Sequence, residues 1–218
     1  MPSTSRPPKN RRQRRAPIEV QDLVLRAAHR LFTAHGYHGT TTLQIAKEAG
    51  VGESVIFRNF GSKAELFETA IARPFTDFVD EWAARWDVDV AADSDPIEIT
   101  RSFVKGFYAL ADEHRDLLHT LMAARLKGGD RALAEVADRV SARLADHLRT
   151  VQKVLLHHGA ARQLRALDTP VSVAMAVGSV LSLVLLDDWL FPPHQRRPGK
   201  VRQIDEATQM LLYGVLGS

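Results

Sequence analysis

Hydrogen-bond donors recur at short spacing between Thr41 and Lys63, in the stretch TTLQIAKEAGVGESVIFRNFGSK. It contains hydroxyl, amide, guanidinium and ammonium groups, which together suit the oxygens of a phosphate. No nucleophile with a matching base stands among them, and the histidines elsewhere in the chain show no metal-site spacing. The stretch therefore predicts a surface that binds an anion, without a reaction centre or a cofactor.

The same stretch predicts two short helices around a tight turn. Thr41 and Gln44 have the spacing of a capping box, which starts a helix over residues 41–49. Gly50 permits a left-handed backbone, and a second helix follows over residues 53–60. Two helices joined in this way resemble a helix-turn-helix, whose second helix fits the major groove of DNA, although such pairs also occur as plain packing elements. The inward residues expected are Ile45, Ala46, Ala49, Val55, Ile56 and Phe60, with Phe57 open between core and surface.

The flanks of this pair favour DNA. Upstream lies a basic arm, residues 1–16, of a composition that enters a minor groove beside a docked helix. Downstream, Ser62 and Lys63 open a helix, where free N–H groups and an ammonium make a phosphate site. The arm carries Arg6, Lys9, Arg11, Arg12, Arg14 and Arg15.

Helical periodicity extends along most of the chain, so the predicted fold class is all-α with about nine helices. Residues 87–95 are expected to form a loop, and Pro74 is expected to bend the fourth helix. The uncharged run 171–186 is too short for a membrane span of about 20 residues and predicts a buried or interface helix. The expected helices cover 17–36, 41–49, 53–60, 62–86, 96–113, 116–126, 130–158, 169–190 and 201–216.

Composition agrees with a globular protein of the reducing cytoplasm. The 218 residues include no cysteine, and no apolar run follows the N-terminal charges as it would in a secretory signal. The net charge of +3 is unevenly distributed: residues 1–67 hold 11 Lys and Arg against 5 Asp and Glu, and the remainder is slightly acidic. The first part is therefore expected to attract polyanions.

Residues 26–67 resemble the N-terminal domain of the TetR/AcrR family of transcriptional regulators. The resemblance is carried in order by AAxxLF, GYxxTT, IAxxAGV, FRNF and SKAEL. It implies a basic arm (1–16), a DNA-binding domain (17–67) and a helical domain for effector binding and dimerisation (68–218). It also implies a homodimer on a palindromic operator, more often as a repressor, with a helix-four tilt as the response to effector.

The resemblance assigns DNA contacts by position. Thr41 and Lys63 would bind phosphate, Ser54 and Val55 would lie nearest the bases, and Arg58 would serve a phosphate or a guanine edge. The full set expected at DNA is Thr40, Thr41, Gly52, Glu53, Ser54, Val55, Phe57, Arg58, Asn59 and Lys63, with Arg11, Arg12, Arg14 and Arg15 of the arm.

Four positions depart from the usual pattern of the family. Phe57 and Asn59 replace a tyrosine and a histidine, Ser54 stands where glycine is common, and Glu53 stands where lysine is frequent. An acid that faced phosphates would lower affinity, and the arm could offset that loss.

The C-terminal part predicts an effector pocket and a dimer interface. The apolar eighth helix and the apolar end of the ninth would leave a large patch exposed on a monomer. Few charges interrupt the apolar stripes, which favours a hydrophobic effector, although the same aromatic residues could be plain core. The pocket candidates are Phe78, Trp82, Trp86, Phe103, Phe107, Leu121 and Met122.

Two rival functions remain open from the sequence. A sequence-neutral DNA-coating protein would depend on the arginine arm and on salt. A helical enzyme would need a reactive constellation, and the sequence offers none.

Overall fold

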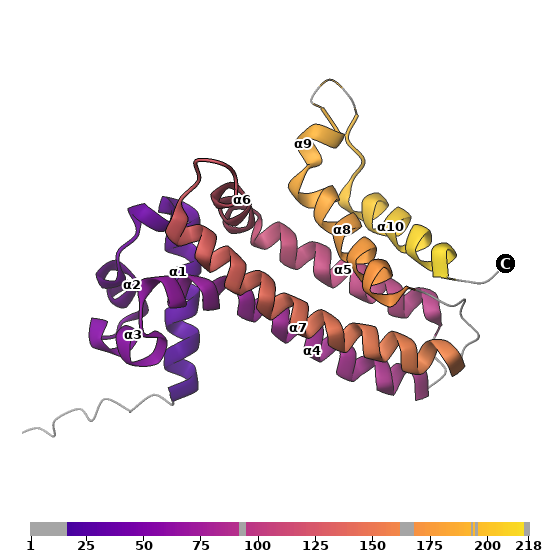
Figure 1. Cartoon of the computed structure of the whole chain (residues 1–218), viewed down its shortest axis with the longest axis horizontal. Coiled ribbons are helices and arrows are strands. Elements are labelled where there is room, and N and C mark those ends of the chain that lie inside the picture. Colours follow the sequence, from indigo (N-terminus) through magenta and orange to yellow (C-terminus); the bar gives the residue numbers. More distant parts are fainter. Residues whose placement is uncertain (1–16, 92–94, 162–167, 193, 195, 216–218) are drawn as a thin grey trace, which may run out of the picture.

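The computed structural model describes residues 17–91, 95–161, 168–192, 194 and 196–215, and within these ranges the regular structure is entirely helical. Figure 1 shows α1 to α3 gathered at one end, α4 and α7 running side by side away from them, and α8 and α10 against α5. The predicted all-α class is confirmed. The helices are α1 (Pro17–Gly39), α2 (Thr42–Ala49), α3 (Glu53–Phe60), α4 (Lys63–Ala91), α5 (Pro96–Glu113), α6 (Arg115–Ala124), α7 (Arg131–Ala161), α8 (Thr169–Leu185), α9 (Asp187–Leu190) and α10 (Lys200–Val215).

Local capping signals set the start of several helices as the sequence predicts. Thr41 and Gln44 form the capping box of α2. The Ser62 hydroxyl accepts from the Glu65 N–H at 3.1 Å at the start of α4, and Asp95 accepts from the Ile97 N–H at 2.9 Å at the start of α5. Each side chain satisfies an N–H that has no partner within its own helix.

Two apolar clusters form the core. The first joins α1, α2, α3 and the start of α4 to α6 and to the first half of α7. The second joins the middle of α4 to α5, α8, α10 and the second half of α7. The expected boundary between residues 67 and 68 falls inside α4, which contributes to both clusters. The helix-turn-helix is therefore continuous in packing with α6 and α7.

Helix ends differ from the sequence prediction at four places. The loop predicted over 87–95 is wrong for residues 87–91, because no Gly or Pro interrupts α4 there. Gly159 does not end α7, since one glycine inside a long helix costs only about 1 kcal/mol. The helix expected over 169–190 is two helices separated at Leu186, whose ψ of 17° departs from helical values. Gly36, with φ 70°, interrupts α1 as expected, but a further helical turn follows to Gly39.

Pro74 lies inside the continuous helix α4. Among the helices that the structure describes, none combines the length and apolar character that crossing a membrane requires.

Candidate DNA interface and effector core

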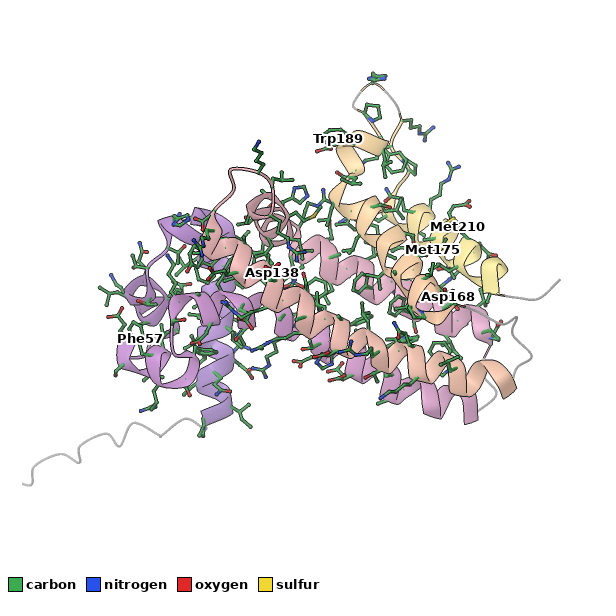
Figure 2. The ribbon with its side chains drawn as sticks, in the orientation of Figure 1. Phe57, Asp138, Asp168, Met175, Trp189 and Met210 are labelled. Carbon is green, nitrogen blue, oxygen red and sulfur yellow. The ribbon has the colours of Figure 1, made fainter. Side chains whose placement is uncertain are left out.

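Helix α3 presents a polar and aromatic face away from the core. Ile56 is fully buried against the neighbouring helices, while Ser54, Phe57 and Arg58 are exposed. Phe57 is 49% exposed, and Figure 2 shows it at the tip of the helix-turn-helix end. Phe57 is therefore a surface residue, which resolves the ambiguity left by the sequence.

The turn that aims α3 is built from glycine and side-chain hydrogen bonds. Gly50 has φ 67°, a left-handed conformation that other residues resist, and its N–H donates to the carbonyl groups of Ala46 and Lys47. The Thr42 hydroxyl donates to a Glu53 carboxylate oxygen at 2.6 Å, which links the start of α2 to the start of α3. The orientation of α3 is thus fixed by contacts on both sides of the turn.

Glu53 and Asn59 are engaged within the protein. Glu53 is half-buried and accepts from Thr42, so its charge is held at the N-terminus of α3, where the helix dipole favours an anion. The Asn59 amide donates to the Val55 carbonyl at 2.7 Å. Two of the four departures from the family pattern therefore have internal partners.

The two threonines before α2 have different surroundings. Thr41 is exposed, and its hydroxyl accepts from the Gln44 N–H at 3.2 Å. Thr40 is fully buried, and its hydroxyl donates to the carbonyl groups of Gly36 and Leu31 at 2.9 and 3.0 Å. Thr40 closes the end of α1 and lacks the exposure that a DNA contact needs, which corrects its predicted role.

Lys63 opens α4 beside an aromatic ring. Its Nζ lies 4.3 Å from the centre of the Tyr37 ring, a cation–π arrangement. Burial lowers the pKa of Lys63. Gly61, two residues before Lys63, has φ 77°, and a Cβ at that position would lie 2.1 Å from a Glu65 carboxylate oxygen. A larger residue would therefore not fit there without a shift. The sequence prediction missed Tyr37, although the GYxxTT motif contains it.

The remaining DNA candidates divide into two groups. Gly52 is exposed at the N-cap of α3, and Val55 is half-buried on its first turn. Arg11, Arg12, Arg14 and Arg15 lie outside the described residues, as does the whole arm.

Five of the predicted pocket residues pack against one another. This aromatic cluster comprises Phe78, Trp82, Trp86, Phe103 and Phe107. The Trp82 and Phe103 rings lie 4.9 Å apart, and Phe103 and Phe107 stack at 5.7 Å. Gly106 lets Phe78 approach α5, because a Cβ at that position would lie 2.5 Å from the Phe78 ring. Trp82, Phe103 and Phe107 are buried, and the linings of the α1–α4 cavity, the α8–α10 groove and the hollow at residues 196–202 contain none of the five residues, so the cluster is packed as core.

Met122 and Leu121 point in different directions on α6. Leu121 is buried in the first core cluster, with α1 to α4, whereas Met122 is 53% exposed. Neither belongs to the aromatic cluster, so a place for Met122 in an apolar pocket stays a prediction.

The far end of the molecule carries exposed apolar side chains on α8 to α10. Met175, Trp189 and Met210 are 68%, 88% and 61% exposed, and Figure 2 shows all three on this end. A groove of about 650 Å³ runs between α8 and α10, with Ser179, Ser182 and Met210 in its lining. An apolar surface of this kind is typical of a protein–protein contact.

Fold and site together define an all-α helix-turn-helix protein with a larger helical body. Residues 24–70 match the family described as bacterial regulatory proteins, tetR family. The transcriptional regulator TcmR of Streptomyces glaucescens is 30% identical over 177 residues, which cover 75% of this chain and 71% of that protein. The chain therefore belongs to the TetR/AcrR family of transcriptional regulators.

Two other similarities have lower sequence identity. The regulator SAB2452 of Staphylococcus aureus is 26% identical over 114 residues. The match covers 52% of this chain and 60% of that protein. FadR from Bacillus subtilis, solved in complex with stearoyl-CoA, superposes with a TM-score of 0.61 at 17% identity, over 89% of this chain and 98% of that one. The second comparison shows a shared fold.

Proposed function

We propose that this regulator is a homodimeric repressor that binds a palindromic operator through α3 and releases it when a hydrophobic effector binds. The observation that carries the proposal is the exposed face of α3. Ser54, Phe57 and Arg58 stand on the outside of α3, whose inner face packs on the core through the buried Ile56 and the half-buried Phe60. A helix held in this way can enter a major groove without rearrangement.

The proposed contact set follows from exposure. Ser54, Val55 and Arg58 would meet base edges or nearby phosphates, while Thr41, Gly52 and Lys63 would donate to phosphates. Phe57 offers apolar contact, such as with a thymine methyl group. Asn59 lies at the edge of the same face. Glu53 would contribute indirectly, because its hydrogen bond with Thr42 helps to orient α3. The arm, with Arg11, Arg12, Arg14 and Arg15, would add minor-groove or backbone contacts.

The dimer is proposed to form through α8 and α10. The exposed Met175 and Met210 lie on these two helices, and the groove between the helices is open to a partner. Two-fold pairing of such a surface would place two α3 helices on two half-sites, as a palindrome requires.

The effector is proposed to enter among the residues of the aromatic cluster. Because that cluster is closed in this state, a ligand would have to separate α4 from α5, and α4 carries Lys63 at its other end. The likeness to FadR, which was solved with stearoyl-CoA, makes long-chain acyl thioesters the first class to test.

The test is selection of operator DNA from random duplexes, followed by fluorescence anisotropy on the selected palindrome and a scrambled copy. Arg58→Ala should weaken palindrome binding about 10-fold to 100-fold if the guanidinium contacts a base. The matched control is Arg131→Ala, because Arg131 is exposed at the start of α7, away from α3. Failure to enrich any palindrome, or equal losses in both variants, would count against the proposal.

The sequence-neutral alternative makes a different prediction. Binding would then be equal for palindrome and scrambled DNA, would fall steeply with salt, and would be mostly lost on removal of residues 1–15. Measuring both duplexes over a salt series separates the two functions.

A further inference from the structure

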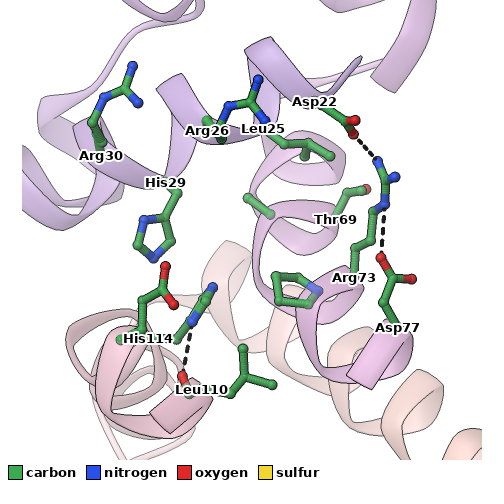
Figure 3. Close-up of a pocket in the computed structure, with 13 residues that line it drawn as sticks. Asp22, Leu25, Arg26, His29, Arg30, Thr69, Arg73, Asp77, Leu110 and His114 are labelled. Carbon is green, nitrogen blue, oxygen red and sulfur yellow. Dashed lines mark hydrogen bonds and ion pairs between the residues drawn. The ribbon is translucent and has the colours of Figure 1, made fainter. Parts of the chain in front are cut away.

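Three metal-ligating side chains meet where α1 crosses the junction of α5 and α6. His29 comes from α1, Glu113 is the last residue of α5, and His114 lies between α5 and α6. The possible ligand atoms of these three residues all lie within 4.8 Å of one another. Figure 3 shows the His29 and His114 rings close together, and they are tilted by 57° with their centres 4.5 Å apart. The spacing of histidines in the sequence predicted no such site.

The orientation of His114 leaves one nitrogen for a ligand. Its Nδ1 lies 3.0 Å from the Leu110 carbonyl oxygen, which can only accept, so Nδ1 carries the proton. In the neutral ring Nε2 then has a free lone pair. A hydrogen bond from the second ring nitrogen to a carbonyl is the arrangement that commonly orients a metal-bound histidine.

His29 has a buried nitrogen without a partner. Its Nε2 is inaccessible to solvent, and no described residue forms a hydrogen bond with it. Buried polar atoms without a partner are uncommon in folded proteins, and an unoccupied ligand site is one explanation for them. Burial also lowers the pKa of His29 and His114, which favours the neutral rings.

There is space beside these groups. A cavity of about 430 Å³ lies between α1, α4 and the end of α5, with His29, Pro74, Glu113 and His114 in its lining. It is open to solvent, so water could reach an ion there.

The arginines that line this cavity would repel a cation, but two of them have carboxylate partners. Arg30 pairs with Glu48 at 2.9 Å, and Arg73 pairs with Asp22 at 3.1 Å and Asp77 at 3.4 Å. The third, Arg26, is exposed on α1. The Glu113 carboxylate, with its ligand atom within 4.8 Å of those of both rings, supplies a negative charge at the site.

We propose that His29, Glu113 and His114 bind one divalent transition-metal ion of the Zn²⁺ class. Two imidazoles and a carboxylate suit such an ion better than Mg²⁺ or Ca²⁺, which prefer oxygen ligands. In a tetrahedral site with metal–ligand bonds of about 2.0 to 2.2 Å, neighbouring ligand atoms stand about 3.4 Å apart. The side chains, whose ligand atoms lie within 4.8 Å of one another, must therefore close by up to about 1.4 Å through side-chain rotation, and water from the cavity completes the coordination.

The site would join the DNA-binding end to the effector end. His29 moves with α1, whereas Glu113 and His114 move with α5, whose aromatic residues belong to the second core cluster. Metal binding itself does not depend on the proposed repressor function, because it requires only the three side chains.

The test is zinc binding by the tag-free full chain, stripped with chelator and assayed without DNA. Titration with ZnCl₂ followed by gel filtration and metal analysis should give one ion per chain, and CoCl₂ should give the visible absorption of a low-coordinate site. His29→Gln and Glu113→Gln should each lower affinity by at least about 10-fold to 100-fold, as loss of even an outer partner does. Circular dichroism checks that each variant is folded.

Matched controls separate this site from other histidines and acids. His119→Gln on α6 and Glu81→Gln on α4 change exposed residues outside the cluster and should keep the affinity of the unaltered chain. The absence of a one-to-one zinc complex, or unchanged zinc affinity in folded His29→Gln and Glu113→Gln proteins, would overturn the proposal. Neither result bears on operator binding, so a failure here is distinct from a failure of the proposed repressor function.

Discussion

The Thr42 hydroxyl donates to the Glu53 carboxylate across the turn of the helix-turn-helix, with 2.6 Å between the two oxygens. This contact ties the first turn of α2 to the first turn of α3. Glu53, which was expected from the sequence to face DNA phosphates, therefore accepts a hydrogen bond from Thr42 of the same protein. The bond therefore helps to orient α3 relative to α2.

A double-mutant cycle should detect this bond. Thr42→Val and Glu53→Ala should each destabilise the protein, and their coupling energy should be about 1 kcal/mol, because both groups are only half-buried. Chemical denaturation at one protein concentration measures all four proteins. Additive effects within about 0.3 kcal/mol would show that the contact contributes nothing to stability.

A buried acid on α4 makes the second prediction. The Glu68 side chain is only 3% exposed and receives Arg139 at 2.6 Å and Arg143 at 2.8 Å, both from α7. The hydrogen bond from Arg139 to Glu68 raises the pKa of the Arg139 guanidinium. Glu68→Ala should cost about 1 to 2 kcal/mol of unfolding free energy, because it removes two charge-assisted hydrogen bonds but leaves two arginines that are about half exposed to water.

Glu135→Ala is the control for Glu68→Ala. Glu135 pairs with Arg131 on the surface of α7 at 3.5 Å, and its removal should change stability by less than about 0.5 kcal/mol. Equal effects in the two variants would mean that the α4–α7 ion pairs do not stabilise the helix pair.

The sequence predicted the helix-turn-helix well because its signals are local. A capping box at Thr41 and Gln44, and the left-handed Gly50, act within a few residues and need no tertiary partner. The same local signals set the starts of α4 and α5. Resemblance to a family then supplied contact roles, but it could not show that Thr40 is buried under the end of α1.

The aromatic cluster, the burial of residues on α6 and the histidine pair could not be predicted in this way, because they depend on contacts between residues distant in the sequence. Periodicity placed Phe78 and Phe103 on inward faces, yet only the fold shows that they meet, at a ring distance of 5.8 Å, as packed core. Met122 and Leu121 are neighbours with opposite surroundings, which depends on how α6 lies against α7. His29 and His114 are 85 positions apart, and no sequence spacing could bring them together.

Acid titration provides the third prediction. The hydrogen bond from Lys200, with a further contribution from Arg115, lowers the pKa of Asp112 in the folded protein. A lowered folded-state pKa contributes stability above the unfolded value of about 3.9, and that stability is lost as the pH falls through the folded value. The free energy of unfolding should therefore decline below about pH 4.

Asp112→Asn isolates this contribution. The variant should be less stable than the unaltered chain at pH 7, by about 1 kcal/mol or less because the pair is partly exposed, and the difference should vanish in acid. Asp116→Asn, at an exposed position on α6, controls for the loss of one surface carboxylate. A difference for Asp112→Asn that persists in acid would refute the assignment.

Coupling through α4 makes the fourth prediction, because this helix spans both core clusters. The chain has no cysteine, so Lys47→Cys gives one labelling position on exposed α2 of each protomer. Pulsed spin-label spectroscopy should show a changed distance between the two labels when an effector releases DNA. Release without any change in that distance would exclude the tilt of α4 as the mechanism.

The dimer surface makes the last prediction. Met210 is exposed on α10 at the groove shared with α8, so Met210→Glu should place a charge inside the proposed interface. Light scattering coupled to gel filtration should then report a monomer, whereas the unaltered chain should be a dimer. Leu126→Glu is the control, since Leu126 is similarly exposed but follows α6 at the other end of the molecule.

Because a monomer engages one half-site at a time, Met210→Glu should also lose most of its affinity for a palindrome while keeping its affinity for a half-site. A Met210→Glu protein that stays dimeric would place the interface elsewhere.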